Sequence, residues 1–192
     1  MLTSIRCPAG PGTTPPTIRA AEPGDHDAIR TVVSLAYTQY TCDIDPAVWA
    51  AFRADLLDLD KHARNGHLLV ATVAGDVAGY AAFYPDASVQ GMGWPTGWAG
   101  GRGLAVHPLH RGHGVAAALM AAFDDCARTV DAPAFAFHTS EFMTTARALY
   151  ERLGYRRAPA FDIDVNAHYG IDAPRPWTAL GYLKFLSAAH AA

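Results

Sequence analysis

The stretch that most constrains the fold of this chain runs from residue 104 to residue 117. It begins as a short apolar strand that ends at Pro108, continues as a turn containing Gly112 and Gly114, and ends as the start of a helix. Glycine lets a ligand approach the backbone closely, and the first N–H groups of a helix are free donors at the positive end of its dipole. Because no Asp or Glu occurs between residues 87 and 123, the turn is predicted to bind an anion such as a phosphate or pyrophosphate.

The glycine spacing distinguishes between kinds of phosphate site. The Walker pattern G-x-x-x-x-G-K-[ST] is absent, whereas Gly112, Gly114 and Ala117 satisfy the relaxed dinucleotide pattern G-x-G-x-x-A. A dinucleotide site also needs an acidic residue at the end of the following strand. Asp131 has about the right spacing, but it precedes the apolar run 132–138 instead of ending it. A dinucleotide-binding oxidoreductase therefore stays a distant alternative.

Two motifs of the chain resemble those of a known family. The pattern Leu-x-Val-x-Pro-x-x-Arg-Gly-x-Gly-x-Ala, residues 104–116, is similar to the acetyl-CoA-binding signature of the GNAT N-acetyltransferase superfamily. Its core element, Arg/Gln-x-x-Gly-x-Gly/Ala, falls on Arg111, Gly114 and Ala116. Further along, the segment 146–155 reads Ala-Arg-Ala-Leu-Tyr-Glu-Arg-Leu-Gly-Tyr. It resembles the second motif of the family, a helix that carries a tyrosine and ends in glycine and an aromatic residue.

The resemblance implies an α/β fold whose central mixed, mostly antiparallel sheet is flanked by helices and has about six or seven strands. In that family the fourth and fifth strands splay apart, and the pantetheine arm of the cofactor acetyl-CoA enters the gap. The resemblance would place the pantetheine along Leu104, Ala105 and Val106. The pyrophosphate would lie on the amides of the turn and of the helix that follows, namely Arg111, Gly112, His113, Gly114, Val115, Ala116 and Ala117.

The resemblance also implies an activity, the transfer of an acetyl group from acetyl-CoA to a primary amine by direct attack. The acceptor is expected to be a small-molecule or peptide amine. Tyr150 falls on the position of the tyrosine that often acts as the acid in this family, although the apolar stripe it shares with Leu149 and Leu153 also suits a core aromatic. Many relatives carry Asn seven residues before this tyrosine. Here that residue is Met143, so one polar contact to the cofactor is expected to be missing.

The identity of a general base stays open at this stage. Some relatives keep a catalytic Glu on the fourth strand, but the corresponding segment, residues 101–107, contains no glutamate. Glu141 and His138, at the end of the next expected strand, are the nearest titratable candidates. A capping or surface role for each, and a water relay without a dedicated base, are the alternatives. A non-catalytic acyl-CoA-binding or regulatory module on the same fold is therefore a second functional hypothesis.

Composition limits the remaining classes of protein. With 192 residues and 51% hydrophobic positions, we expect one domain over residues 17–192 behind a flexible tail, residues 1–16, rich in Pro, Gly and Thr. No apolar run approaches the length of a membrane span, and a net charge of −3 argues against general nucleic-acid or membrane binding. The three cysteines form no CxxC motif, so a reducing cytoplasm is the expected compartment. Homodimerisation stays open.

Two clusters of polar residues have competing interpretations. The histidines at 107, 110 and 113 recur every third residue, but Pro108 and Gly112 interrupt them and no Cys or carboxylate is near, so no metal site is predicted. An acidic set lies where the family forms an acceptor wall. Its members are Asp43, Asp45, Asp55, Asp58 and Asp60. A solvated helix face is the simpler interpretation, whereas a pocket lined by them would favour a cationic amine with an apolar body.

Hydrophobic periodicity predicts the other elements. Helices are expected after the N-caps Asp25 and Asp45 and over residues 115–126 and 146–153. Strands are expected over residues 17–21, 67–73, 77–84, 102–107, 132–139, 155–165 and 177–186. The segment Pro85–Gly101 is predicted to be a loop, and its Trp94 and Trp98 are expected to close over the acceptor site.

Overall fold

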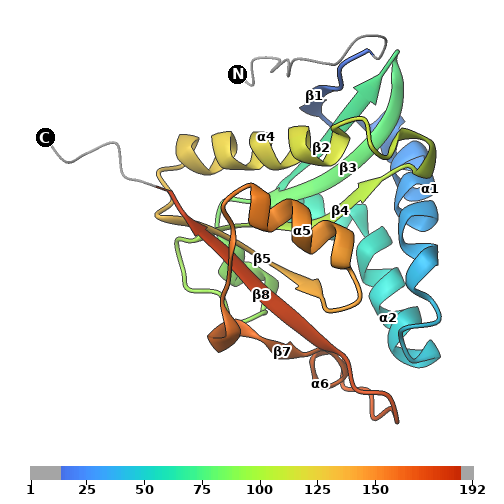
Figure 1. The fold of residues 1–192 in the computed structure, drawn as a ribbon, viewed down its shortest axis with the longest axis vertical. Helices are drawn as coiled ribbons and strands as arrows, with labels where there is room; N and C mark the ends of the chain where they lie inside the picture. The colour runs from blue at the N-terminus through green and yellow to red at the C-terminus, as the bar shows by residue number, and fades with distance from the viewer. Residues whose placement is uncertain (1–13, 187–192) are drawn as a thin grey trace, which may run out of the picture.

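The computed structural model describes residues 14–186, so nearly all of the predicted tail, 1–16, lies outside the described residues. Within them, eight strands form one sheet in the order β1-β2-β3-β4-β5-β8-β6, and β7 pairs with β8 (Figure 1). The strands are β1 (Thr17–Ala20), β2 (His67–Val73), β3 (Asp76–Tyr84), β4 (Ala99–Val106), β5 (Ala134–Ser140), β6 (Arg156–Arg157), β7 (Ile163–Asp164) and β8 (Thr178–Phe185). Every pairing is antiparallel except β4–β5. The predicted fold class is confirmed.

Helices cover both faces of the sheet (Figure 1). On what we call the α4 face lie α4 (Val115–Thr129) and α5 (Thr144–Arg152), and on the α1 face lie α1 (His26–Tyr37), α2 (Pro46–Leu57) and α3 (Leu59–Asn65). Successive strand side chains point to opposite faces. Phe83 of β3 accordingly belongs to the core under α4, and Tyr84 belongs to the core under α1. A short helix, α6 (Val165–His168), follows β7.

The pairing between β4 and β5 is confined to one end of the strands. It consists of Ala99 opposite Phe135 and Gly100 opposite Ala136. Beyond these two pairs the strands diverge, which confirms the predicted splay. Gly103 adds a bulge to β4 opposite β3, with a φ of +68° that favours glycine.

The helix caps predicted in the N-terminal half of the chain were partly right. Asp45 caps α2, because its side chain accepts a hydrogen bond from the Ala47 N–H at 3.0 Å. Asp25 precedes α1 but makes no side-chain cap. Its carboxylate instead pairs with Arg19 at 2.6 and 2.8 Å, because the fold brings the end of β1 beside it. Helix α3 was not predicted, since seven residues are too few to show a helical period.

Two predicted boundaries were wrong. The loop Pro85–Gly101 is shorter, because Ala99, Gly100 and Gly101 already belong to β4. These small residues show no apolar pattern, so the strand was not predicted. Close packing requires them, because a Cβ on Gly100 would lie 2.6 Å from the Ala87 Cβ. The expected strand 155–165 is instead two short strands, β6 and β7, separated by a turn at Pro159–Phe161. Proline has no N–H to donate to the sheet, so it interrupts the strand there.

Candidate active site

A cavity of about 520 Å³ lies where β4 and β5 diverge. Its wall contains the β4 residues Gly101–Val106 and the β5 residues Phe137–Ser140. Val115 and Tyr150 line it from the α4 face, while Tyr37 and Phe52 line it from the α1 face. The cavity therefore connects the two faces of the sheet through the gap in the strand pairing.

The glycine turn forms one end of this cavity. Gly112 and Gly114 both have a φ of +79°, and Gly114 is the N-cap residue of α4. The first bond within the helix runs from the Ala118 N–H to the Gly114 oxygen at 2.9 Å. The N–H groups of residues 115–117 precede that bond, so they remain available to a ligand. A negatively charged group at this helix end would also be stabilised by the dipole.

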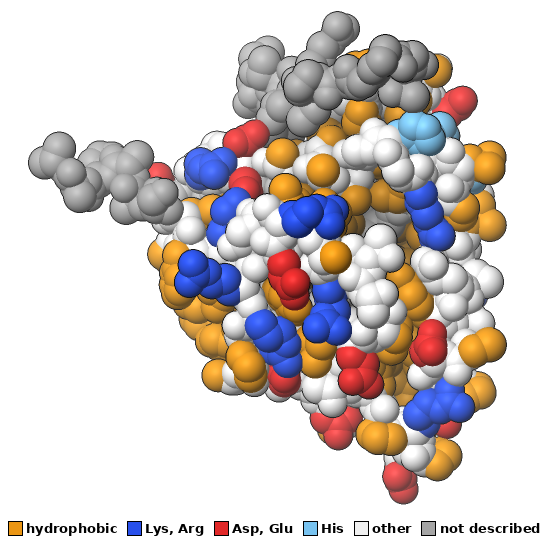
Figure 2. All heavy atoms as spheres, in the orientation of Figure 1, with side chains coloured by type: hydrophobic (Ala, Val, Ile, Leu, Met, Phe, Trp, Pro, Cys, Tyr) orange, Lys and Arg blue, Asp and Glu red, His pale blue; other side chains and the backbone are white. Residues whose placement is uncertain are grey.

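Basic side chains surround the same turn. Figure 2 shows histidine and Lys or Arg side chains gathered over this end of α4, next to α1. Arg111 reaches across to the end of α1, where its guanidinium donates to the Ala36 carbonyl at 3.3 Å, and to the side chain of Gln39, just after that helix, at 3.4 Å. All the predicted cofactor residues line the cavity except His113.

The structure places the three predicted catalytic residues differently. Tyr150 of α5 and His138 of β5 line the cavity, whereas Glu141 is exposed and is not part of its wall. Tyr150 is 6% exposed and packs against Phe137, with ring centroids 4.5 Å apart. Burial raises the pKa of Tyr150, so its hydroxyl stays protonated at neutral pH.

His138 has one ring nitrogen engaged and one without a protein partner. Its Nε2 lies 2.7 Å from the Phe161 carbonyl oxygen, which fixes Nε2 as the donor because a carbonyl only accepts. Nδ1 is buried and has no hydrogen-bond partner among the described residues. Burial lowers the pKa of His138 to about 4, so at neutral pH Nδ1 presents a lone pair rather than a proton.

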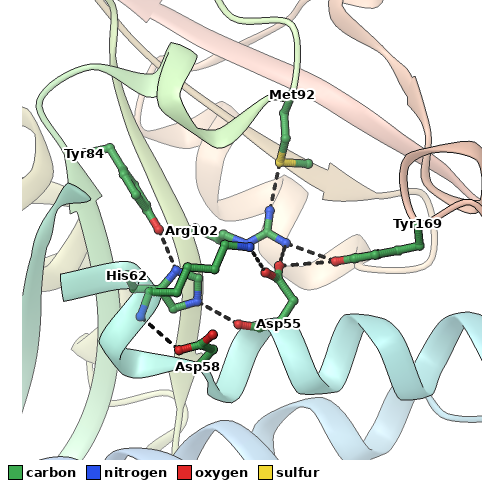
Figure 3. A network of polar contacts seen from close by, with 8 residues as sticks. Asp55, Asp58, His62, Tyr84, Met92, Arg102 and Tyr169 are labelled. Atoms are coloured by element: carbon green, nitrogen blue, oxygen red, sulfur yellow. Dashed lines mark hydrogen bonds and ion pairs between the residues drawn. The ribbon is translucent and has the colours of Figure 1, made fainter. Parts of the chain in front are cut away.

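The sequence analysis missed Arg102, the charged residue at the centre of the site. It lies on β4 and points toward the α1 face, where it forms an ion pair with Asp55 of α2 (Figure 3). The hydroxyl of Tyr169 lies 3.2 Å from both Arg102 Nη2 and Asp55 Oδ2. A charged residue within a glycine-rich strand was the signal that could have revealed it, because arginine is rarely buried without a partner.

The acidic set turns out to be split. Asp43, Asp58 and Asp60 are exposed, as a solvated helix face predicts, but the side chain of Asp55 is only 8% exposed. Burial alone would raise the pKa of Asp55, yet Arg102 and Lys61 lower it to about 2. None of the residues lining the cavity is Asp or Glu. The idea that this set forms a pocket for a cationic amine is therefore not supported.

The two tryptophans of the segment before β4 occupy different positions. Trp94 lines the cavity and packs against His138 in a tilted arrangement, with ring centroids 4.5 Å apart. Trp98 is not part of the cavity wall and packs instead on Phe161 and Phe185. Only Trp94 is therefore placed to contact an acceptor.

The cavity suits acetyl-CoA. Its turn end offers free helix N–H groups and Arg111 to phosphates, and no carboxylate lines the wall to repel them. The middle of the cavity runs along β4 residues 104–106, whose backbone has no β5 partner. Unpaired strand groups are able to bond the amides of an extended pantetheine arm.

Comparison with known proteins identifies the family. Residues 30–155 match the model of the acetyltransferase (GNAT) family, so the chain belongs to that family, whose members use acetyl-CoA as the acetyl donor. No curated protein matches the sequence significantly. Across residues 14–186, no helix is both long and apolar enough to cross a membrane.

Solved structures share the fold at low sequence identity. The Salmonella typhimurium protein yncA, solved with its cofactor acetyl-CoA, is 21% identical, with 92% of this chain and 96% of that chain covered and a TM-score of 0.61. The ribosomal-protein-S18-alanine N-acetyltransferase of Escherichia coli is 16% identical, with 91% and 96% covered and a TM-score of 0.62. A Corynebacterium glutamicum protein described as histone acetyltransferase HPA2 and related acetyltransferase is 21% identical, with 92% and 99% covered and a TM-score of 0.65.

Proposed function

We propose that this protein is an N-acetyltransferase that transfers the acetyl group of acetyl-CoA to a primary amine by direct attack. The observation that carries the proposal is the cavity that connects the two faces of the sheet. The glycine turn, which we propose binds the phosphates, lies at its α4 face, and aromatic side chains of α1 and α2 line its α1 face. Two substrates entering from opposite faces would therefore meet beside β4, which suits a direct transfer between them.

In this proposal the chain supplies binding, orientation and one proton. Acetyl-CoA, when bound, supplies an activated thioester. The phosphates would lie on the amides of Arg111–Ala117, and the pantetheine along Leu104, Ala105 and Val106. Tyr150, which stays protonated, is the proposed proton donor to the departing thiolate. Backbone N–H groups near Val106 would polarise the carbonyl.

The acceptor amine must lose a proton during the transfer, so a group or a water molecule must accept it. His138 Nδ1 is proposed to accept a hydrogen bond from the amine or from a water that relays its proton. With a pKa of about 4, His138 is a weak base, so it orients the amine better than it deprotonates an ammonium ion. Glu141, exposed outside the cavity, would have to act through solvent.

The cytoplasm is the proposed compartment. Cys42 and Cys126, the cysteines within residues 14–186, are both free, which suits a reducing environment.

A thiol-release assay tests the proposal. Purified protein is mixed with acetyl-CoA and screened against polyamines, aminoglycosides, amino acids and peptides, and free CoA is measured. Release of CoA that depends on one class of amine is the expected result. If acetyl-CoA binds by calorimetry but no amine triggers release, the non-catalytic acyl-CoA-binding module would be the better description.

A further inference from the structure

The register of β4 and β5 places two side chains at the opening of the gap. Gly100 and Ala136 form the last strand pair. Arg102 and His138 lie two residues further along each strand, so they point to the same face as that pair. This is the α1 face, because the Cβ of Ala87 approaches Gly100 there and Arg102 pairs with α2. The two side chains therefore flank the acceptor end of the cavity.

Arg102 keeps donor capacity that the protein does not use. Its side chain is 12% exposed, and Nη2 is engaged by Asp55 and Tyr169 (Figure 3). Nη1 donates to the sulfur of Met92 at 2.8 Å, a weak acceptor, and Nε is buried without a partner among the described residues. Because guanidinium has five N–H donors, acceptor groups are in short supply around it.

The charge around Arg102 is not balanced by Asp55. The same carboxylate also pairs with Lys61, so two cations share one anion. His62 is neutral at pH 7, because burial lowers its pKa to about 4, so it does not change the charge of this cluster. Arg102 therefore shares the buried carboxylate of Asp55 with Lys61, and no Asp or Glu of the cavity wall offers it a second acceptor.

A second unused donor lies on the same wall. The side-chain Nε2 of Gln90 is buried without a partner among the described residues and lines the cavity. It lies 3.3 Å from the position that a Cβ on Gly100 would occupy, so it shares the face and neighbourhood of Arg102. Buried donors without acceptors are costly unless a ligand satisfies them.

We infer that the acceptor amine carries a carboxylate, which Arg102 binds with help from Gln90, as in an amino acid or a related small acid. The inference rests on the proposed function and names its substrate class. Phe52, Trp94 and Trp177 line the adjoining wall, so an apolar or aromatic body suits the rest of the acceptor. A polyamine would instead place positive charge against Arg102.

The experiment compares, on the unchanged protein, three amines that share one aromatic side chain: an aromatic amino acid, its carboxamide and the decarboxylated amine. CoA release is measured with each. A charged hydrogen bond of this kind changes specificity by about 10- to 100-fold, so kcat/KM for the acid should exceed that for the other two by such a factor. Equal rates, or a preference for the decarboxylated amine, would overturn the inference while leaving acetyl transfer in place.

Variants then assign the effect to Arg102. Arg102→Met should lower kcat/KM for the acid about 10- to 100-fold toward the value for the carboxamide, and acetyl-CoA affinity should stay unchanged. Arg102→Lys, which keeps the charge, should restore part of the preference. Arg53→Met, an exposed arginine of α2, is the matched control and should keep it fully. An acid preference that survives in folded Arg102→Met would contradict the role of Arg102. CoA release with none of the three amines would contradict the inference about the acceptor, whereas only the absence of release across the whole amine screen would contradict the proposed function.

Discussion

At the scale of single residues, the burial that makes Tyr150 a core aromatic also keeps its hydroxyl protonated. Its ring packs on Phe137, and it lines the cavity. One side chain can therefore have both a structural and a catalytic role. Measuring kcat together with the unfolding free energy distinguishes the two.

Tyr150→Phe should lower kcat by about 10²-fold, the lower end of what a general acid contributes, and leave the KM for acetyl-CoA nearly unchanged. Tyr155→Phe is the matched control, because its hydroxyl bonds Asp124 at 2.6 Å and it does not line the cavity. That control should lose about 1 kcal/mol of unfolding free energy with kcat intact. A loss of activity in Tyr150→Phe that merely follows its loss of stability would favour a purely structural tyrosine.

Single residues also mark the limit of what the sequence predicts about the site. That the turn and Tyr150 lie at one site was predictable, because motif and spacing are local properties. Arg102 and Asp55 lie 47 positions apart, and the sequence contains no sign of their pairing. The same holds for Trp94 and Trp98, which are equivalent in the sequence but contact different surroundings after packing.

At the scale of elements, the glycine turn needs glycine because of its backbone conformation and not because neighbouring side chains crowd it. A Cβ at Gly114 would meet nothing within 4 Å, so glycine is required there by its φ of +79° and by the space that a ligand needs.

Gly114→Asp should abolish acetyl-CoA binding, because a negative charge would lie where we propose that the phosphates bind. Gly114→Asn tolerates the left-handed conformation and carries no charge, so it should retain measurable binding. Gly75→Asp, in the β2–β3 turn with a φ of +96°, controls for strain alone. Calorimetry on the folded variants is the measurement, and unchanged affinity in Gly114→Asp would refute the position of the phosphates.

Elements long enough to repeat an apolar pattern were predictable from the sequence, whereas shorter elements were not. Helices α1, α2, α4 and α5 each show an apolar stripe, and the β2–β3 hairpin has a recognisable turn at Ala74 and Gly75, both with positive φ. The segments that became β6, β7 and α6 are only two to four residues long. The conformation of β6 and β7 follows from pairing with β8, which periodicity does not encode.

At the scale of the whole molecule, two buried histidines make the fold sensitive to mild acid. Burial lowers the pKa of His62 and of His138 to about 4, against about 6.5 in an unfolded chain. Between these values the unfolded state binds more protons, so stability is fully present above pH 6.5 and is lost as the pH falls toward 4.

Lowering the pH from 7 to 5 should therefore reduce the unfolding free energy by about 2 kcal/mol for each of these histidines. Urea denaturation at a series of pH values measures it. His138→Gln should remove part of this pH dependence, because the pKa of His138 is one of those that burial lowers. The buried Asp55, with a pKa of about 2, acts only at lower pH, so a flat profile between pH 7 and pH 5 would contradict neutral buried histidines.

The two strand pairs between β4 and β5 have a consequence for the integrity of the molecule. Strands β1 to β4 form one half-sheet and β5 to β8 the other, and Ala99 and Gly100 provide the hydrogen-bonded connection between them. Beyond these pairs, the edges of β4 and β5 face the cavity without a strand partner. An extended ligand with amide groups, seated between these edges, would act as an additional strand and make the sheet continuous. Acetyl-CoA bound in the proposed position would therefore complete the sheet across this gap.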